Sequence, residues 1–318
     1  MPSRPAHVHR RRRPTTFSGV RFGVHTGLQN TSIGELQALW RRIEDHGFSW
    51  ISIWDHFYAA DGTGNPHSLE AVASHAALAA STSTVRCGSL VYSVGYRHPA
   101  VLANAMATLD DLSGGRITLG LGAGWLAQEY AAYGLNFEPV GVRLRRLEEA
   151  VQCVRSLLTQ DVTTFSGKFY ALDAARCEPK PVQERLPIWI GGGGEKVTLR
   201  IAARHADGWN VPFVSPETYA HKVEVLHAHC EQAGRDPAEI THAINVGLAF
   251  REEDLHAQFG RIAEAVSPGV LQGSVAEMLD RVAAYRDAGA ELCILAMRAP
   301  FDVDGLDRFA AEILPALG

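Results

Sequence analysis

An acid and a base stand side by side at one point of the chain, directly after a short apolar run. The run 50–53 is followed by Trp54, Asp55, His56 and Phe57. Histidine has a usual pKa near neutrality and can move protons, and a neighbouring carboxyl group can bind or orient a polar ligand. The pair could therefore carry catalysis. It could also be a turn-capping Asp beside a packing His, and spacing alone leaves both interpretations open.

A second histidine, His25, ends the preceding apolar run. If the two runs are neighbouring strands, His25 and His56 face the same pocket. A metal hydrolase would need paired histidines at the first strand end and further ligands later, whereas His25 stands alone and His75 falls in a predicted helix. The chain also lacks the Gly-x-Ser-x-Gly turn of serine hydrolases. We therefore expect neither a metal site nor a serine nucleophile.

Two glycine-rich segments could lie against a ligand. Gly191, Gly192, Gly193 and Gly194 precede a predicted helix. Glycine lets the backbone approach an anion, and the first N–H groups of a helix are unpaired donors, so these residues predict a phosphate site. A flexible turn is the alternative. The motif at 120–124, Gly-x-Gly-Ala-Gly, could also bring a ligand close to the backbone, but it is common and carries less weight.

Alternating strand and helix patterns must position these residues. Strands are expected at 20–25, 50–54, 85–91, 117–121, 187–190, 208–211, 243–250 and 292–296. Helices are expected at 32–45, 68–80, 99–111, 142–159, 196–205, 216–233, 274–288 and 304–314. The first should begin at Ser32, with Glu35 completing a capping box. Eight strand-helix units predict an α/β protein, a (β/α)8 TIM barrel with insertions.

The connection after the fourth strand is longer than the others. It contains the segment 125–137, the long helix and a predicted hairpin at 163–170, so we expect an insertion at about 122–186. An open doubly wound sheet would need a glycine fingerprint directly after the first strand. Thr-Gly-Leu-Gln-Asn stands at 26–30 instead. The barrel is therefore favoured.

Composition limits the domain count and the partners. The chain has 318 residues, 46% of them hydrophobic, so one barrel domain at 19–318 accounts for it. A net charge of -5 favours neither nucleic acid nor a membrane surface. Five scattered cysteines fit a reducing cytoplasm. Residues 1–18, with four consecutive arginines and no apolar signal segment after them, predict a disordered basic arm.

Tryptophans divide into two groups by position. Trp40, Trp50 and Trp189 fall within predicted elements and should be core. A second group lies at strand ends, where it could wall a pocket for a planar ring, and comprises Trp54, Trp125 and Trp209. Tyr58, in the loop 58–65, joins Trp54 and Trp125 as a predicted substrate-pocket residue. The loops 125–141 and 252–273 should also shape the substrate site.

Taken in order, these motifs resemble the luciferase-like monooxygenase superfamily, and within it the coenzyme F420-dependent oxidoreductases. The resemblance covers nearly everything from Val20 onward. It rests on six segments in the expected order, at 54–57, 96–100, 108–116, 120–125, 191–194 and 202–209. It implies a small-molecule substrate and hydride transfer to or from C5 of the deazaflavin.

The resemblance also implies roles for particular residues. Asp55 and His56 would contact the cofactor ring, and His56 would stabilise charge or move a proton. Leu90 and Val91 would form a non-prolyl cis peptide behind the ring. The glycines 191–194 would hold the phosphate, and the other cofactor contacts would be His25, Ala123, Gly124 and Gln128.

One departure bears on the substrate. The F420-dependent sugar-phosphate dehydrogenases of this superfamily carry a catalytic glutamate after the fourth-strand glycines, where this chain has Trp125. That activity is therefore not expected. Glu129, four residues on, is expected to serve structure. Alternatives are an FMN-dependent monooxygenase, supplied with reduced flavin by a partner reductase and using O2, and a non-catalytic cofactor-binding barrel. The family also suggests a homodimer.

Overall fold

The computed structural model describes residues 19–60 and 63–317, so the predicted basic arm at 1–18 lies outside the described residues. The strands are β1 Arg21–Thr26, β2 Trp50–Ile53, β3 Arg86–Ser89, β4 Tyr92–Ser93, β5 Ile117–Gly122, β6 Thr163–Ser166, β7 Ala171–Ala175, β8 Ile188–Gly191, β9 Gly208–Pro212, β10 Thr241–Ala249, β11 Val270–Gln272 and β12 Leu292–Met297. The helices are α1 Ile33–Asp45, α2 Ala71–Ser81, α3 Pro99–Ser113, α4 Ala127–Ala132, α5 Val140–Thr159, α6 Thr198–His205, α7 Pro216–Ala233, α8 Glu252–Phe259, α9 Ala263–Val266, α10 Val275–Asp287 and α11 Val303–Arg308.

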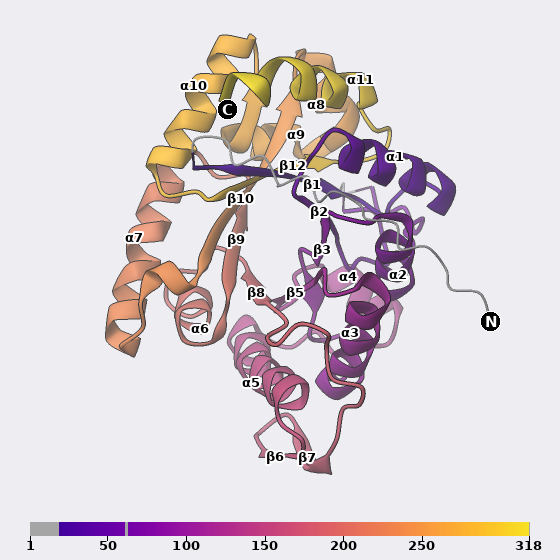
Figure 1. The fold of residues 1–318 in the computed structure, drawn as a ribbon, viewed down its shortest axis with the longest axis vertical. Coiled ribbons are helices and arrows are strands. Elements are labelled where there is room, and N and C mark those ends of the chain that lie inside the picture. Colours follow the sequence, from indigo (N-terminus) through magenta and orange to yellow (C-terminus); the bar gives the residue numbers. More distant parts are fainter. Residues whose placement is uncertain (1–18, 61–62, 318) are drawn as a thin grey trace, which may run out of the picture.

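Eight parallel strands close into a barrel in the order β1, β2, β3, β5, β8, β9, β10, β12. β12 pairs back onto β1, with Arg21 opposite Leu292, so the described barrel is closed. Helices surround the barrel, and the β6–β7 hairpin projects from it beside α5 (Figure 1). The predicted (β/α)8 barrel is confirmed.

Local signals set several element ends as expected. Ser32 caps α1 and forms a capping box with Glu35, the reciprocal bonding that satisfies unpaired N–H groups at a helix start. α7 occupies the predicted 216–233. Gly114 and Gly234 end α3 and α7 in the left-handed conformation that glycine adopts without steric cost.

Two segments differ from expectation. The predicted third strand is interrupted, because β3 ends at Ser89 and pairing resumes at β4 after a cis Leu90–Val91 peptide. The segment 252–273, expected to be irregular, contains α8, α9 and β11, and β11 pairs with β10. These elements are short, with a break at Gly260, whose φ is 53°, so no sustained periodicity marks them in the sequence.

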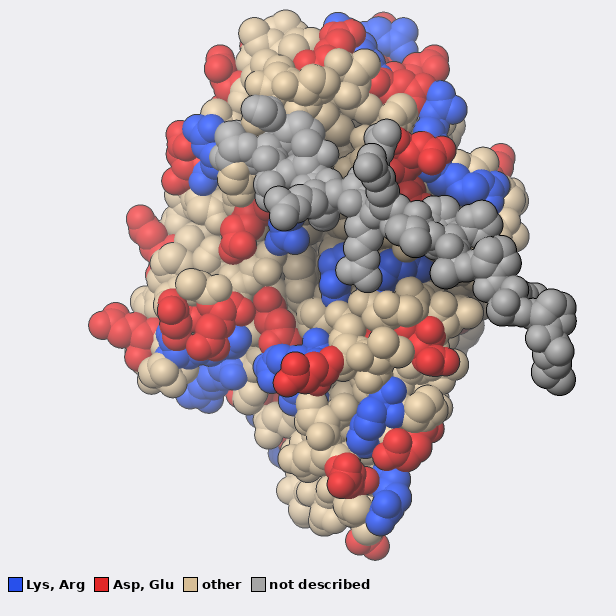
Figure 2. Space-filling model, viewed as in Figure 1, with Lys and Arg blue, Asp and Glu red and all other residues tan. Residues whose placement is uncertain are grey.

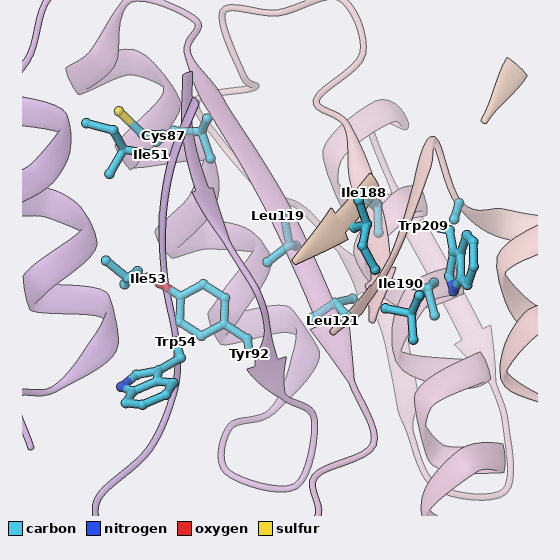
Figure 3. Close-up of a cluster of buried hydrophobic side chains, with 14 of the residues drawn as sticks. Ile51, Ile53, Trp54, Cys87, Tyr92, Leu119, Leu121, Ile188, Ile190 and Trp209 are labelled. Atoms are coloured by element: carbon cyan, nitrogen blue, oxygen red, sulfur yellow. The ribbon is translucent and has the colours of Figure 1, made fainter. Parts of the chain in front are cut away.

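The strands alternate between two environments. In β2, Ile51 and Ile53 join the apolar cluster that packs the barrel against its helices, whereas Ser52 is turned the other way, toward His25. Figure 3 shows the corresponding apolar residues of β5 and β8, namely Leu119, Leu121, Ile188 and Ile190. Alternation along each strand therefore leaves the barrel interior to a separate set of residues.

The outer surface mixes both signs of charge, and acidic and basic side chains are interspersed over the face in Figure 2. Among the described residues, no helix is both long and apolar enough to cross a bilayer.

Candidate functional site

A cavity of about 610 Å³ lies at the C-terminal ends of the barrel strands. Most of the predicted site residues line it: His25, Trp54, Asp55, His56, Leu90, Val91, Ala123, Gly124, Trp125, Gly191, Gly192 and Gly194. They come from loops far apart in the sequence. Barrel topology brings them together because parallel strands end at a common face.

Three predicted residues lie outside the cavity wall. Tyr58 is half-buried and packs edge-on against the Tyr133 ring, with ring centroids 6.5 Å apart. Gln128 is exposed and lies near Gly64. Gly193 belongs to the glycine loop but does not line the cavity. Its carbonyl accepts a 2.8 Å hydrogen bond from Lys222 Nζ.

Asp55 is buried directly after β2. Its Oδ2 accepts hydrogen bonds from the Ser93 N–H at 3.1 Å and from Arg97 Nη1 at 2.7 Å. Its other oxygen, Oδ1, is buried and has no hydrogen-bond partner among the described residues. Burial raises the pKa of Asp55, and the nearby Arg97 guanidinium opposes that rise. A buried acceptor without a partner, in a cavity wall, is well placed for a ligand N–H or O–H group.

His56 is held from behind by a carboxylate. Its Nδ1 lies 3.1 Å from both Oε1 and Oε2 of Glu129, and the Glu129 side chain is fully buried. The imidazole packs nearly perpendicular to two indoles, with its ring centroid 5.3 Å from that of Trp54 and 5.5 Å from that of Trp125. Because Nδ1 faces Glu129, the opposite ring edge with Nε2 faces the cavity.

Glu129 accepts further hydrogen bonds. Its Oε1 accepts the Phe57 N–H at 3.0 Å and the Tyr58 N–H at 2.9 Å, and its Oε2 accepts the Tyr96 hydroxyl. Burial alone would raise the pKa of Glu129, but the donors, His56 first among them, lower it below its usual value. Glu129 is therefore ionised at neutral pH. The sequence predicted only a structural role for Glu129, but its carboxylate also contacts His56.

His25 occupies the same wall as expected, because β1 and β2 pair with His25 opposite Ser52. Its Nδ1 lies 2.9 Å from Ser52 Oγ, and its ring stands 5.8 Å from the Trp54 ring. Burial lowers the pKa of His25 to about 3, with Arg298 and His56 adding smaller effects. His25 is therefore a neutral hydrogen-bonding group near neutral pH.

The Gly120 and Gly122 pair serves packing more than ligand approach. A Cβ on Gly120 would lie 2.0 Å from the Ser89 carbonyl oxygen, and one on Gly122 would lie 2.5 Å from the Val91 side chain. A Cβ on Gly191 would also meet Val91, at 2.7 Å. These glycines make room for Val91. Val91 is the second residue of the cis peptide, and the predicted position of that peptide is confirmed.

The loop 191–194 keeps the features of an anion cradle. Gly192 has a φ of 121°, a conformation that side chains other than glycine rarely adopt. Gly192, Gly194 and Thr198 all line the cavity, and Thr198 begins α6. Backbone N–H groups before a helix start, with a hydroxyl beside them, suit a phosphate.

Three further residues that the sequence left without a role belong to the site. Tyr96 lines the cavity and bonds Glu129, and Arg97 pairs with both Asp55 and Glu70. Arg298 follows β12 directly, lines the cavity and lies over the Trp54 ring at 4.9 Å. The signal for Arg298 was present, because polar residues at C-terminal strand ends are the functional positions of a barrel.

The chain is similar in sequence to proteins of one family. The luciferase-like monooxygenase family model matches residues 15–267. An F420-dependent glucose-6-phosphate dehydrogenase from Nakamurella multipartita is 33% identical over 73% of this chain and 68% of that protein. An FMNH(2)-dependent dimethylsulfone monooxygenase from Pseudomonas putida is 29% identical over 76% of this chain and 65% of that protein.

A solved structure shares the fold. The structure of an F420-dependent secondary alcohol dehydrogenase, in complex with an F420-acetone adduct, has a TM-score of 0.82 at 22% identity and covers 94% of this chain and 99% of that one. The sequence relatives named above are oxidoreductases, one dependent on F420 and one on reduced FMN, the two cofactors that were predicted. The predicted resemblance is confirmed, and the chain belongs to the luciferase-like monooxygenase family.

Proposed function

We propose that this protein is an F420-dependent oxidoreductase that transfers hydride between the deazaflavin and a small organic substrate. The observation that carries the proposal is the Asp55–His56 pair, which shares one cavity with the 191–194 glycine loop. The pair offers a hydrogen-bond acceptor and a proton-transfer group, and the loop offers an anion cradle. A phosphate-bearing ring cofactor needs both.

The described residues fit such a cofactor. Asp55 Oδ1 would accept a hydrogen bond from the ring, because it is a buried acceptor without a protein partner. Gly194 and Thr198 would hold the phosphate, because the Gly192 N–H already donates to the Asn210 carbonyl at 2.9 Å. When bound, F420 supplies the hydride chemistry. His56 would hold or release a proton at Nε2 as the substrate carbon is oxidised or reduced.

A sugar phosphate is not the substrate that we propose, although matched relatives are glucose-6-phosphate dehydrogenases. Trp125 stands where those enzymes are expected to have a catalytic glutamate. Its indole is 62% exposed at the cavity rim and contacts the His56 ring edge-on. An indole can pack on an uncharged substrate but cannot exchange a proton as a carboxylate does.

The second candidate is an FMN-dependent monooxygenase, favoured by the match to a dimethylsulfone monooxygenase. Such an enzyme would receive reduced flavin from a partner reductase. We also propose a cytoplasmic homodimer, on family grounds.

Cofactor binding separates the candidates. Purified protein is titrated separately with F420 and with FMN while fluorescence is followed, and we expect F420 to bind more tightly. Gly194→Asp should weaken F420 binding at least tenfold, because it places a carboxylate in the phosphate loop. Gly34→Asp, in open space on α1, is the matched control and should not change it. Tight FMN binding without F420 binding would favour the monooxygenase, and cofactor binding without any turnover would favour a non-catalytic barrel.

A further inference from the structure

We propose that Glu129 is a positioning residue that sets the tautomer of His56, so that Nδ1 carries the proton and Nε2 presents a lone pair to the cavity. The use of that lone pair in hydride transfer rests on the proposed function. The tautomer itself does not, because it follows from the contacts of this chain.

The first step is the charge of the partner. Glu129 is ionised, and an ionised carboxylate only accepts hydrogen bonds. Both of its oxygens lie 3.1 Å from His56 Nδ1. Nδ1 must therefore be the donor, and in a neutral imidazole the proton is then absent from Nε2.

The second step is that Glu129 cannot turn away. Its Oε1 is anchored by the N–H groups of Phe57 and Tyr58, the two residues that follow His56. Its Oε2 is anchored by the Tyr96 hydroxyl. Burial and the bond to Glu129 raise the pKa of Tyr96, so this phenol stays protonated and remains a donor. The two backbone N–H groups can only donate, so the carboxylate must accept at Oε1.

The third step concerns the other titratable groups of the cavity wall. From β1, the neutral His25 faces His56 across the Trp54 ring. From the end of β2, Asp55 is engaged by Arg97 and the Ser93 N–H. Arg97 is shared with Glu70. The Trp54 and Trp125 rings pack nearly perpendicular to the imidazole and offer no carboxylate to Nδ1.

A second glutamate provides a matched control. Glu149 on α5 accepts the N–H groups of Lys168, Phe169 and Tyr170, at 2.8, 2.8 and 3.2 Å. It organises a loop just as Glu129 organises residues 57–58, but none of its described bonds involves a histidine. Glu149→Gln therefore reports loop capping alone.

The Glu129→Gln variant tests the assignment directly. The amide oxygen can keep the Phe57 and Tyr58 bonds made by Oε1, and the NH2 group replaces Oε2. That group can donate to Nδ1, while the amide oxygen stays about as close to Nδ1 as Oε1 is now, at 3.1 Å, so the preference for Nδ1–H should weaken and the Nε2–H population should rise. Imidazole 15N chemical shifts distinguish the two tautomers. The His56 signals are identified among the 14 histidines by their absence from the His56→Ala spectrum.

We expect Nδ1–H in the native protein and in Glu149→Gln, and a clearly larger Nε2–H population in Glu129→Gln. The opposite tautomer in the native protein overturns the proposal even if the variant fails to fold. An unchanged tautomer in folded Glu129→Gln overturns it as well.

Turnover gives a second readout. With F420 and a panel of small alcohols, Glu129→Gln should lower kcat about 10²- to 10⁴-fold, the range for loss of a positioned base or its correct tautomer. Its pH-rate profile should lose the limb that reports the base. Tyr96→Phe should cost only a few fold, and Glu149→Gln nothing measurable. If no turnover is found with any cofactor, the proposed function fails while the tautomer result still stands.

Discussion

The two ends of the barrel are built from the same eight strands, but one end is filled by side chains and the other opens into a cavity. At the N-terminal end, the Trp50 and Trp189 rings stack 4.7 Å apart with an interplanar angle of 20°. Ala243, Leu292 and Ile294 complete this cluster and close the interior. At the C-terminal end, the interior widens into the cavity that contains Asp55 and His56.

At both ends, glycines leave room for a neighbouring group because they have no Cβ. At the N-terminal end, a Cβ on Gly23 would lie 2.7 Å from the Trp50 Cβ, and one on Gly88 would lie 2.1 Å from the Trp50 indole. A Cβ on Gly208 would lie 2.3 Å from the Trp189 indole. At the cavity end, Gly122 and Gly191 make the corresponding room for Val91, and Gly120 makes room for the Ser89 carbonyl. The ends differ in what fills that room. Large aromatic rings exclude water and stabilise the fold, whereas small residues leave space that a ligand can occupy.

The largest effect separates activity from stability at the cavity end. His56→Ala should lower turnover about 10²- to 10⁴-fold, because general acid–base groups contribute that much. The unfolding midpoint in urea and the F420 affinity should change little. Turnover with F420 and a panel of small alcohols is the measurement. Unchanged turnover would remove His56 from the chemistry while leaving the cofactor site in place.

The closed end should show the reverse. Trp50→Ala should lower the free energy of unfolding by about 3–5 kcal/mol, the usual cost of truncating a buried large aromatic side chain. Trp125→Ala is the matched tryptophan at the other end. Because Trp125 is largely exposed, its stability change should stay within about 0.5 kcal/mol while KM changes. Urea denaturation and initial rates measure the two, and equal destabilisation would contradict the division of roles.

The glycine argument can be tested at a single atom. Gly88→Ala should destabilise the protein by about 1–3 kcal/mol, because the new Cβ would lie 2.1 Å from the Trp50 ring. Gly34→Ala, on the surface of α1 with nothing within 4 Å, should instead stabilise by about 0.4–1 kcal/mol. Thermal and urea unfolding report both. A neutral Gly88→Ala would mean that the tryptophan pair can shift freely.

The smallest effect concerns pH. His25 has a pKa of about 3 in the folded protein against 6.5 as its usual value, so below pH 6.5 the unfolded chain binds a proton that the folded chain does not. Stability therefore falls as pH falls toward 3. The His25→Asn variant has no imidazole to protonate at this position. When the pH falls from 6.5 to about 5, its free energy of unfolding should therefore fall by about 1.5 kcal/mol less than that of the native protein. Parallel stability curves would show that His25 is solvated and titrates normally.

Local signals made much of the fold predictable. The Ser32 and Glu35 capping box sits at the start of α1, and α7 keeps its predicted bounds, because caps and helical period are properties of neighbouring residues. The segment 252–273 was missed since its helices are short and interrupted. Site residues that follow strands, such as Asp55 and His56, could be placed at the cavity because the end of a strand can be recognised in sequence.

By itself, the sequence determined the order of the eight barrel strands, the barrel they form and the strand-end positions of its titratable residues, because each depends on a local pattern repeated along the chain. Only the tertiary structure decided which groups meet. Glu129 reaches His56 across 73 residues of sequence, and Trp50 stacks on Trp189 from a distant strand. Such pairings depend on barrel closure, which places the residues in space and leaves no mark in the sequence around either one.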